Sequence, residues 1–138
     1  MNCQDIADRA ARKINNIWHG LYVHCPVCGD MWSLDPDAYG QPAECQNCHE
    51  EMEEYTLYDW FNPDNGDILE VNDYKVRRRG ESPHAVIVTI GYGGPNVYFD
   101  SDKEGVEVYW WGNYAFSPVD HDACEEILRL AQEDWDCQ

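Results

Sequence analysis

The chain has 138 residues, and its 27 Asp and Glu residues against 9 Lys and Arg residues give a formal net charge of −18. A surface of this sign repels phosphate groups, which argues against broad contact with nucleic acids or with acidic membranes. Aromatic residues make up 13% of the chain, whereas disordered chains are poor in aromatics. We therefore expect one folded domain, which either binds a basic partner or has no partner and uses its charge for solubility.

The N-terminal sequence and the cysteine content indicate the compartment. The chain begins Met-Asn-Cys-Gln-Asp, without the basic and apolar segments of a secretory signal. Its apolar runs are far shorter than the roughly 20 residues of a membrane span. Seven Cys residues, four of them in two Cys-x2-Cys pairs, indicate a reduced metal-binding protein rather than a disulfide framework. The sequence thus predicts a cytoplasmic protein that does not bind membranes.

The charges are segregated along the chain. Residues 14–74 contain 13 carboxylates and no Lys or Arg, and residues 80–138 contain 12 carboxylates against Lys103 and Arg129. The remaining basic residues lie at 9–13 and 75–79. A charged run is often only a solvated surface, but segregation on this scale also fits a docking surface for a basic partner. Both interpretations stay open at this point.

The first half of the chain predicts one helix and two extended segments. Apolar residues at helical spacing predict a helix over residues 5–18, with Asn2 or Asp5 as its N-cap. The aromatic-rich segment 56–61 is predicted to be extended and to end in an Asn-Pro-Asp-Asn-Gly turn. Residues 68–76 then predict a further strand.

The last third predicts a meander of strands covered by a helix. A central strand is expected at 85–90, which is β-branched and apolar on both faces, and two more at 97–100 and 106–111, which alternate in polarity and are separated by turns. Asp120 is a good N-cap for a helix that reaches about Trp135. The predicted fold class is α+β, an antiparallel sheet of about three to five strands with N- and C-terminal helices and a four-cysteine zinc module. We expect a single compact domain over residues 1–138, with a zinc-knuckle module at about 22–52 and the meander and helix at about 84–136.

The two cysteine pairs predict a metal site. They read Cys-x2-Cys-x16-Cys-x2-Cys, a spacing typical of four-cysteine zinc sites, and the ligands are Cys25, Cys28, Cys45 and Cys48. Four thiolates leave no open coordination position, so one structural Zn²⁺ per chain is expected. Iron is the alternative metal, because the spacing alone does not separate the two. His24 and His49 adjoin the pairs and are expected to lie beside the site rather than to replace a ligand.

No motif in the sequence indicates catalysis. A zinc deaminase needs His-x-Glu before Pro-Cys-x2-Cys, and a P-loop needs Gly-x4-Gly-Lys-Ser/Thr; this chain has neither. Cys124 is expected in the core of the C-terminal helix, whereas Cys3 and Cys137 are terminal and expected to be free thiols. We predict that the protein is not an enzyme and has no catalytic residues.

Two groups of residues are candidates for partner binding. One face of the predicted meander gathers aromatic residues among carboxylates, a combination suited to an Arg-rich surface; it comprises Tyr98, Tyr109, Trp111, Asp100, Asp102, Glu104 and Glu107. Alternatively, the N-terminal helix or the zinc module covers this face, and its aromatics belong to the core. The second candidate is the acidic run that follows Cys48, namely Glu50, Glu51, Glu53 and Glu54.

Part of the sequence resembles a known class of proteins. The resemblance to small phage- and prophage-borne proteins rests on a block that covers about a third of the chain, Gly93-Gly94-Pro95, Tyr98-Phe99-Asp100, Val108-Tyr109-Trp110-Trp111-Gly112 and Pro118, followed by an acidic helix. With its cysteine pairs and its acidity, the chain resembles zinc-containing anti-CRISPR proteins directed at type II effectors. The resemblance implies a non-enzymatic inhibitor that binds a Cas nuclease inside a bacterial host. Such inhibitors often occupy the basic channel meant for nucleic acid. The resemblance assigns no binding residues, because this family has no shared binding residues that can be transferred position by position.

The sequence therefore leads to one functional hypothesis and two alternatives. The first is an anti-CRISPR inhibitor that binds an RNA-guided Cas nuclease through an acidic surface and blocks target DNA loading or cleavage, without direct contact to nucleic acid. The second is a zinc-ribbon adaptor that binds proteins in phage or host transcription. The third is a metalloenzyme. The sequence does not specify an oligomeric state.

Overall fold

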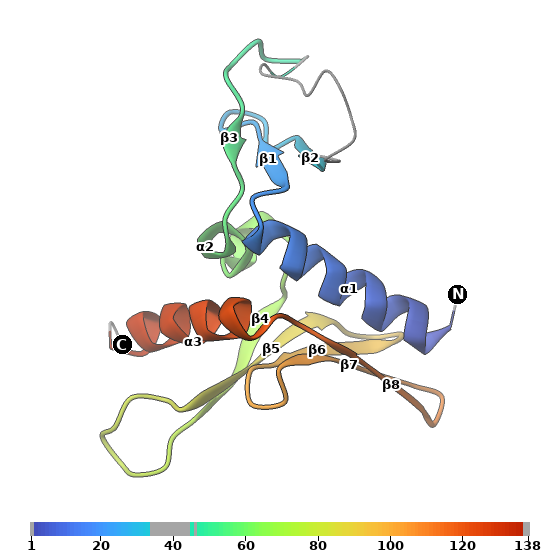
Figure 1. The fold of residues 1–138 in the computed structure, drawn as a ribbon, viewed down its shortest axis with the longest axis vertical. Helices are drawn as coiled ribbons and strands as arrows, with labels where there is room; N and C mark the ends of the chain where they lie inside the picture. Colours follow the sequence, from blue (N-terminus) through green and yellow to red (C-terminus); the bar gives the residue numbers. More distant parts are fainter. Residues whose placement is uncertain (1, 34–44, 46, 137–138) are drawn as a thin grey trace.

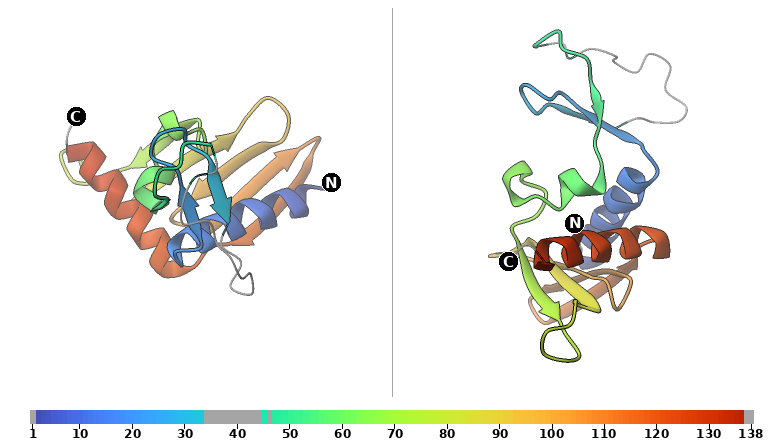
Figure 2. Two further views of the ribbon diagram at one scale, coloured as in Figure 1. Left: turned by 90° about the horizontal axis from the view of Figure 1, so that it is seen from above. Right: turned by 90° about the vertical axis from the view of Figure 1, so that its left-hand side faces the viewer.

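A computed structural model describes residues 2–33, 45 and 47–136. The predicted fold class is confirmed, because the structure combines terminal helices with two antiparallel sheets, one of three strands and one of five (Figure 1). The five-stranded sheet and the helices form a layered body, and the three-stranded sheet projects from one side of it (Figure 2). We call this projection the cysteine module and define it as residues 22–33, 45 and 47–54.

The N-terminal helix α1 spans Cys3–Trp18. Asn2 accepts a hydrogen bond from the Asp5 N–H at 2.9 Å, and the Asp5 carboxylate accepts one from the Asn2 N–H, which makes a reciprocal capping box. The buried residues fall at helical spacing and form one apolar stripe, which comprises Cys3, Ala7, Ala11, Ile14 and Ile17. The helix therefore forms where the sequence predicts it and packs one face against the sheet.

The cysteine module is built on a short hairpin. Strands β1 (Tyr22–His24) and β2 (Met31–Ser33) pair antiparallel, and β3 (Glu53–Glu54) pairs with the other edge of β1. The N–H of Tyr55 donates to the carbonyl of Tyr22 at 2.9 Å, and Tyr22 packs on the main core. The base of the module is thus attached to the body, and its far end lies away from it (Figure 1).

Residues 56–61 are helical, so the prediction of an extended segment there is wrong. Helix α2 spans Leu57–Trp60, and Thr56 and Asp59 form its capping box. Leu57 and Trp60 are buried, and the ring of Trp60 meets that of Phe99 edge to face at 6.1 Å. The capping residues and core packing outweigh the β-propensity of the aromatics. A 3₁₀ turn, η1 (Pro63–Asn65), follows in the predicted Pro-Asp-Asn-Gly turn.

The main sheet is an antiparallel meander with the strand order β4-β5-β6-β7-β8. Its strands are β4 (Glu70–Lys75), β5 (Ala85–Gly91), β6 (Asn96–Asp100), β7 (Gly105–Trp110) and β8 (Asn113–Pro118). The first four match the predicted strands within two residues at each end. Strand β8 is not among the predicted strands, because its buried residues are the small Ala115 and Ser117, which give little strand signal.

Both long helices lie on the same face of this sheet. Helix α3 (His121–Asp136) packs on α2 and β5, and α1 packs on β7 and β8 (Figure 2). The alternation along β7 follows from this arrangement, since Val106 and Val108 are buried towards the helices and Glu107 and Tyr109 face the other way. Among the described residues, no helix is long and apolar enough to cross a bilayer.

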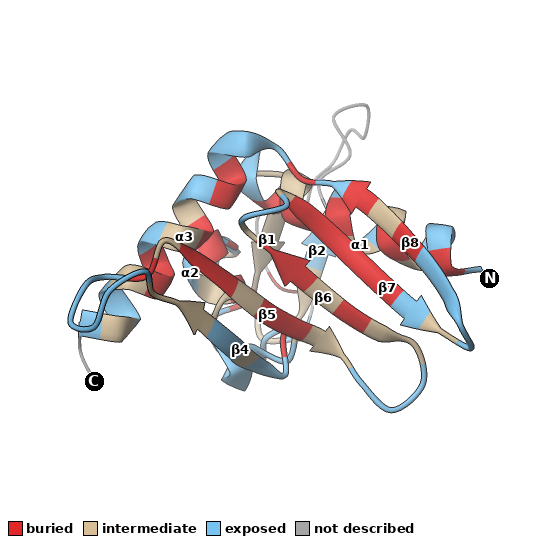
Figure 3. Cartoon of the chain, turned by 90° about the horizontal axis from the view of Figure 1, so that it is seen from below, coloured by how far each residue is buried: buried red, intermediate tan, exposed pale blue. Residues whose placement is uncertain are grey.

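The opposite face of the sheet is open. Figure 3 views the molecule from this side, with the sheet in front and both long helices behind it. Of the described elements, neither α1 nor the cysteine module covers this face, so the alternative that one of them does is wrong. We call it the open face; its largest side chains are Tyr98, Tyr109, Tyr114 and Phe116, which the strand register places beside one another.

Candidate metal centre

The first cysteine pair lies in the turn that joins β1 to β2. The N–H of Cys25 donates to the carbonyl of Asp30 at 2.8 Å, and the N–H of Gly29 donates back to the carbonyl of Cys25 at 2.9 Å. Gly29 has φ +79°, a left-handed conformation that glycine adopts without strain. The turn therefore closes tightly enough to direct Cys25 and Cys28 to one point.

The second pair repeats this geometry immediately before β3. The N–H of Cys45 donates to the carbonyl of Glu50 at 2.8 Å, and the N–H of His49 donates to the carbonyl of Cys45 at 2.8 Å. The Asn47 side-chain amide donates to the Asp30 carboxylate at 2.6 Å and links the two turns. The pairs thus form two matched turns, as expected for paired zinc knuckles.

The two turns gather the four predicted ligands. The sulfur atoms of Cys25, Cys28, Cys45 and Cys48 all lie within 4.8 Å of one another. Cys25 and Cys45 are buried, Cys48 is half-buried and Cys28 is exposed, so the site lies at the surface of the module. This cluster is able to hold a metal ion, as the spacing predicts.

Hydrogen bonds and the closeness of the sulfur atoms shift the pKa values of the Cys25 and Cys28 thiols in opposite directions. The backbone N–H groups of Cys28 and Val27 point at the sulfur of Cys25 and lower the pKa of that thiol to about 7. The Asp30 N–H favours the Cys28 thiolate in the same way, but desolvation and the adjacent sulfurs outweigh it and raise the pKa of Cys28 to about 12. Four thiolates at this distance repel one another, and a bound cation would remove that repulsion.

The remaining residues near or outside the cluster are also placed. The ring of His24 packs edge to face on Tyr55, with the ring centroids 5.2 Å apart. His49 lies in the second cysteine turn and has a left-handed backbone with φ +59°. Of the described His, Cys, Asp and Glu residues, only the four cysteines form a group close enough to share an ion. Cys124 is buried, as predicted, and burial raises its pKa to about 12. Cys3 is a free thiol, as predicted, and it is buried in the core; Cys137 lies outside the described residues.

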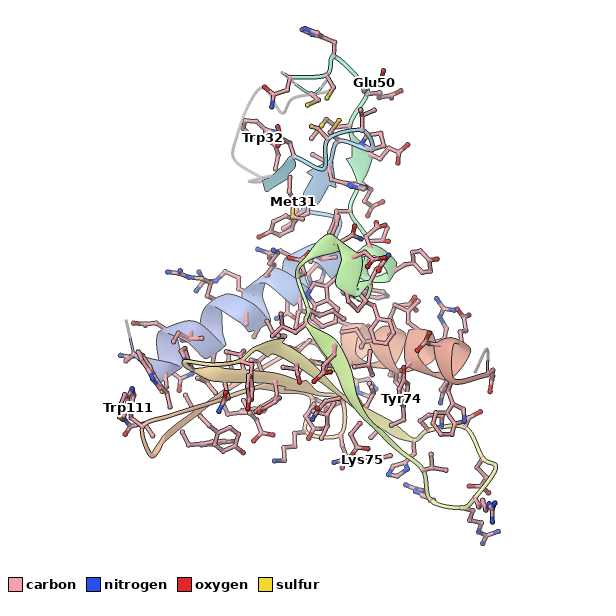
Figure 4. The ribbon with its side chains drawn as sticks, turned by 180° about the vertical axis from the view of Figure 1, so that it is seen from behind. Met31, Trp32, Glu50, Tyr74, Lys75 and Trp111 are labelled. Carbon is pink, nitrogen blue, oxygen red and sulfur yellow. The ribbon has the colours of Figure 1, made fainter. Side chains whose placement is uncertain are left out.

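The acidic run after Cys48 is exposed throughout its length. Glu50, Glu51, Glu53 and Glu54 all project from the module, and Figure 4 shows Glu50 at its outer edge. None of the four forms an ion pair with a described residue. The run is therefore available for a basic partner.

The second candidate surface divides into exposed and structural residues. Asp100 and Glu107 are only 3% and 4% exposed, so the expectation that they lie on an accessible acidic surface is wrong. Asp100 accepts the N–H of Asp102 at 2.9 Å, because it closes the β6–β7 turn. Glu107 pairs with Lys103 at 2.8 Å and accepts the Tyr109 hydroxyl at 2.6 Å. The carboxylates of Asp100 and Glu107 therefore bind groups within the fold and are not presented to a partner.

The other members of this group are accessible to different degrees. Asp102 is exposed, Glu104 is half-buried and pairs with His121, and Tyr98 is half-buried on the open face. The ring of Tyr109, itself 43% exposed, lies 6.3 Å from that of Tyr98 and 5.1 Å from that of Tyr114. Tyr114 completes this row of rings but is not among the predicted residues, because the strand that carries it is not predicted. The alternation of Tyr114 and Phe116 after Gly112 is the sequence signal that would have identified this strand and its exposed tyrosine.

Trp111 is the most exposed large apolar side chain described, at 86%. It occupies the first position of the two-residue turn between β7 and β8, with φ +53°, and Gly112 follows with φ +74°. Positive φ at both central residues defines a type I′ turn, which normally carries Asn-Gly. Figure 4 places Trp111 at the tip of this hairpin, far from the cysteine module.

The fold and the site together define a class: an α+β protein with a projecting four-cysteine module that can hold a metal ion. No protein-family model matches the chain, and no curated protein or solved structure matches it either.

Proposed function

We propose that the protein is a phage- or prophage-encoded anti-CRISPR inhibitor, which binds a type II Cas nuclease in the host cytoplasm and blocks target DNA loading or cleavage. The observation that carries the proposal is Trp111, an almost fully exposed Trp on a strained turn in a chain of net charge −18. Trp is the residue most enriched among the dominant contacts of protein interfaces. An exposed Trp on a chain with this net negative charge suits a basic protein partner.

The backbone of Trp111 supports a binding role. A bulky residue in the left-handed region costs about 1–2 kcal/mol, and such strain is concentrated at functional sites. Nothing in the packing requires Trp there, since the side chain is 86% exposed. A Trp at this position is explained if its side chain is buried on binding.

Charge supports the choice of partner. Cas nucleases hold the guide–target heteroduplex in a positively charged channel that recognises its backbone. The exposed carboxylates of the module, Glu50, Glu51, Glu53 and Glu54, present negative charge to a partner of this kind. An acidic protein can occupy such a channel in place of DNA, with no nucleic acid bound directly to it.

A structural Zn²⁺ completes the proposal. Four thiolates around one tetrahedral ion fill its coordination, so the ion orders the module and supplies no reactive position. The filled site also carries about two further negative charges, because four thiolates exceed the charge of Zn²⁺. Zinc therefore reinforces the acidity of the surface.

A DNA cleavage assay with a panel of purified type II effectors tests the proposal. We expect inhibition that weakens as salt rises from roughly 0.01 M to 0.15 M, because the Debye length falls from about 30 Å to 8 Å. Trp111→Ala should weaken inhibition about 30-fold, the loss expected at a dominant interface contact. Tyr92→Ala is the matched control, since Tyr92 is 76% exposed on another turn. Unchanged cleavage by every effector would exclude the proposed function.

One observation favours the alternative of a transcription adaptor. The cysteine module projects from the body and carries Glu50 at its outer edge (Figure 4), an arrangement suited to protein docking by the module alone. Replacing Glu50, Glu51, Glu53 and Glu54 with Gln separates the two functions. Wild-type protein that binds RNA polymerase without inhibiting any nuclease, and that loses this binding in the Gln variant, would support the adaptor.

A further inference from the structure

A hollow lined partly by Tyr74 lies at the opposite end of the body from the Trp111 turn (Figure 4). A cavity of about 630 Å³ opens between α2, η1, β4 and the C-terminal part of α3. This volume is within the range of about 300–1,000 Å³ found for ligand sites. Its walls are formed by Tyr58, Phe61, Asn62, Pro63, Val71, Tyr74, Leu130, Glu133 and Asp134.

Three aromatic rings line this cavity, and they come from different elements. Tyr58 and Phe61 come from α2 and its C-cap, and Tyr74 comes from β4. Tyr58 is 68% exposed, although the core-facing residues of the same helix are buried. The ring of Tyr74 lies 5.4 Å from that of Trp135 and is held by a hydrogen bond from its hydroxyl to Asp134. The ring of Tyr74 is therefore fixed before any ligand binds.

The carboxylates on one wall carry a net negative charge. Glu133 pairs with Arg129, which also pairs with Glu126, so these three groups together carry one uncompensated charge. Asp134 accepts only the neutral hydroxyl of Tyr74 among the described residues, and its charge is not balanced. A carboxylate has lone pairs for several donors, so Asp134 can accept a further hydrogen bond.

We propose that this cavity binds an arginine side chain of a basic protein partner. A guanidinium stacks on aromatic faces and pairs with carboxylates through two parallel donors, whereas an ammonium group offers only a point charge. The apolar residues Val71 and Leu130 suit the methylene stem of the same side chain. This inference rests on the proposed function and deepens it, because it names the chemical group of the basic partner, an arginine side chain, that binds in this cavity.

Titration of the full-length protein with N-acetyl-arginine methylamide, followed by NMR, tests this directly. We expect saturable shifts at Tyr58, Tyr74 and Asp134, and weaker binding of the matching lysine probe. Tyr58→Ala should weaken arginine binding about 2- to 5-fold, the effect of one exposed cation–π contact. Asp134→Asn should weaken it about 10-fold, as for a lost charged hydrogen bond. Equal binding of both probes, or shifts elsewhere, overturns the proposal.

The matched control is Asp136→Asn. Asp136 lies two residues further along α3, so it removes the same charge from another face of the helix. Equal loss in both variants would show that general charge, and not this cavity, attracts the probe. The result is independent of the nuclease assay. Arginine binding without nuclease inhibition would reject the proposed function alone, and inhibition unaffected by Asp134→Asn would reject the role of the cavity alone.

Discussion

Gly29 and His49 occupy equivalent positions in the two cysteine turns. Each donates its backbone N–H to the carbonyl of the first cysteine of its pair, at 2.9 Å for Gly29 and 2.8 Å for His49. Each has a left-handed backbone, with φ +79° and +59° respectively. The same local geometry is therefore made once by the residue suited to it and once by a residue that it strains.

Replacing His49 with Gly should stabilise the metal-loaded module. The left-handed backbone costs an L-residue about 1–2 kcal/mol, and glycine avoids this cost. The greater freedom of glycine in the unfolded chain cancels part of the gain. We expect a net gain of about 0.5–1 kcal/mol in the free energy of unfolding. Chemical denaturation of the zinc-loaded protein measures it.

Gly29→Ala is the control for this change, and it should destabilise the module by a similar amount, because it places a side chain at φ +79°. Open space surrounds this position, so any loss reflects the backbone and not a clash. A lower zinc affinity in His49→Gly would instead assign the imidazole a role at the metal.

Metal removal should disorder the cysteine module and leave the body folded. Elemental analysis should find about one zinc per chain. After chelation, amide exchange should become fast at Cys25 and Cys45, whose N–H groups close the two turns. Exchange should stay slow at Val88 and Val106, which are fully buried in the main sheet.

Two serine substitutions complete this test. Cys45→Ser should abolish zinc binding, because Cys45 is one of the clustered sulfurs. Cys3→Ser should retain one zinc, because Cys3 lies in α1, outside the cluster. Metal-free protein with slow exchange in both turns would show that the module folds without an ion.

Most of the main body follows from sequence periodicity, and the two errors of prediction in that body have clear causes. Helix α1 is identified by apolar residues at helical spacing, and strand β5 by a short β-branched run that is apolar on both faces. The segment 56–61 is misread because its aromatics favour strands, whereas the Thr56–Asp59 capping box decides for a helix. Strand β8 is missed because its buried positions are the small Ala115 and Ser117.

The site was predictable where local spacing determines it. The four metal ligands lie in two short motifs, so their spacing is enough to group them. Surface residues depend instead on tertiary contacts. Alternation along β7 places Glu107 on the correct face, but only the structure shows Lys103 and Tyr109 enclosing it. The aromatic cavity joins α2, β4 and α3, which no local pattern relates.

Glu107 should contribute to stability at neutral pH. Burial opposes its ionisation, but Lys103 and the Tyr109 hydroxyl outweigh burial and lower the pKa of Glu107 below its ordinary value of 4.5. A lowered pKa in the folded state stabilises the fold above pH 4.5, and this contribution is lost as the pH falls through the folded value. Glu107→Gln should therefore cost about 1–3 kcal/mol at pH 7 and flatten the acid limb of the stability curve.

Denaturant unfolding between neutral pH and about pH 3 measures this difference. Asp102→Asn serves as the control, because Asp102 is exposed in the adjacent turn and its loss should leave the acid limb unchanged. An identical acid limb in Glu107→Gln and the wild type would show that Glu107 does not set the pH dependence.

Trp111→Asn should separate stability from binding. Asn-Gly is the preferred pair of a type I′ turn, and asparagine adopts the left-handed region far more readily than tryptophan. Because the Trp111 side chain is 86% exposed, its removal sacrifices little buried surface. We expect a gain of about 1 kcal/mol in the free energy of unfolding together with a loss of nuclease inhibition of about 30-fold. Thermal unfolding and the cleavage assay, run on the same preparation, measure the two effects. A more stable variant that still inhibits fully would remove Trp111 from the interface, and a destabilised variant would show that the indole supports the hairpin itself.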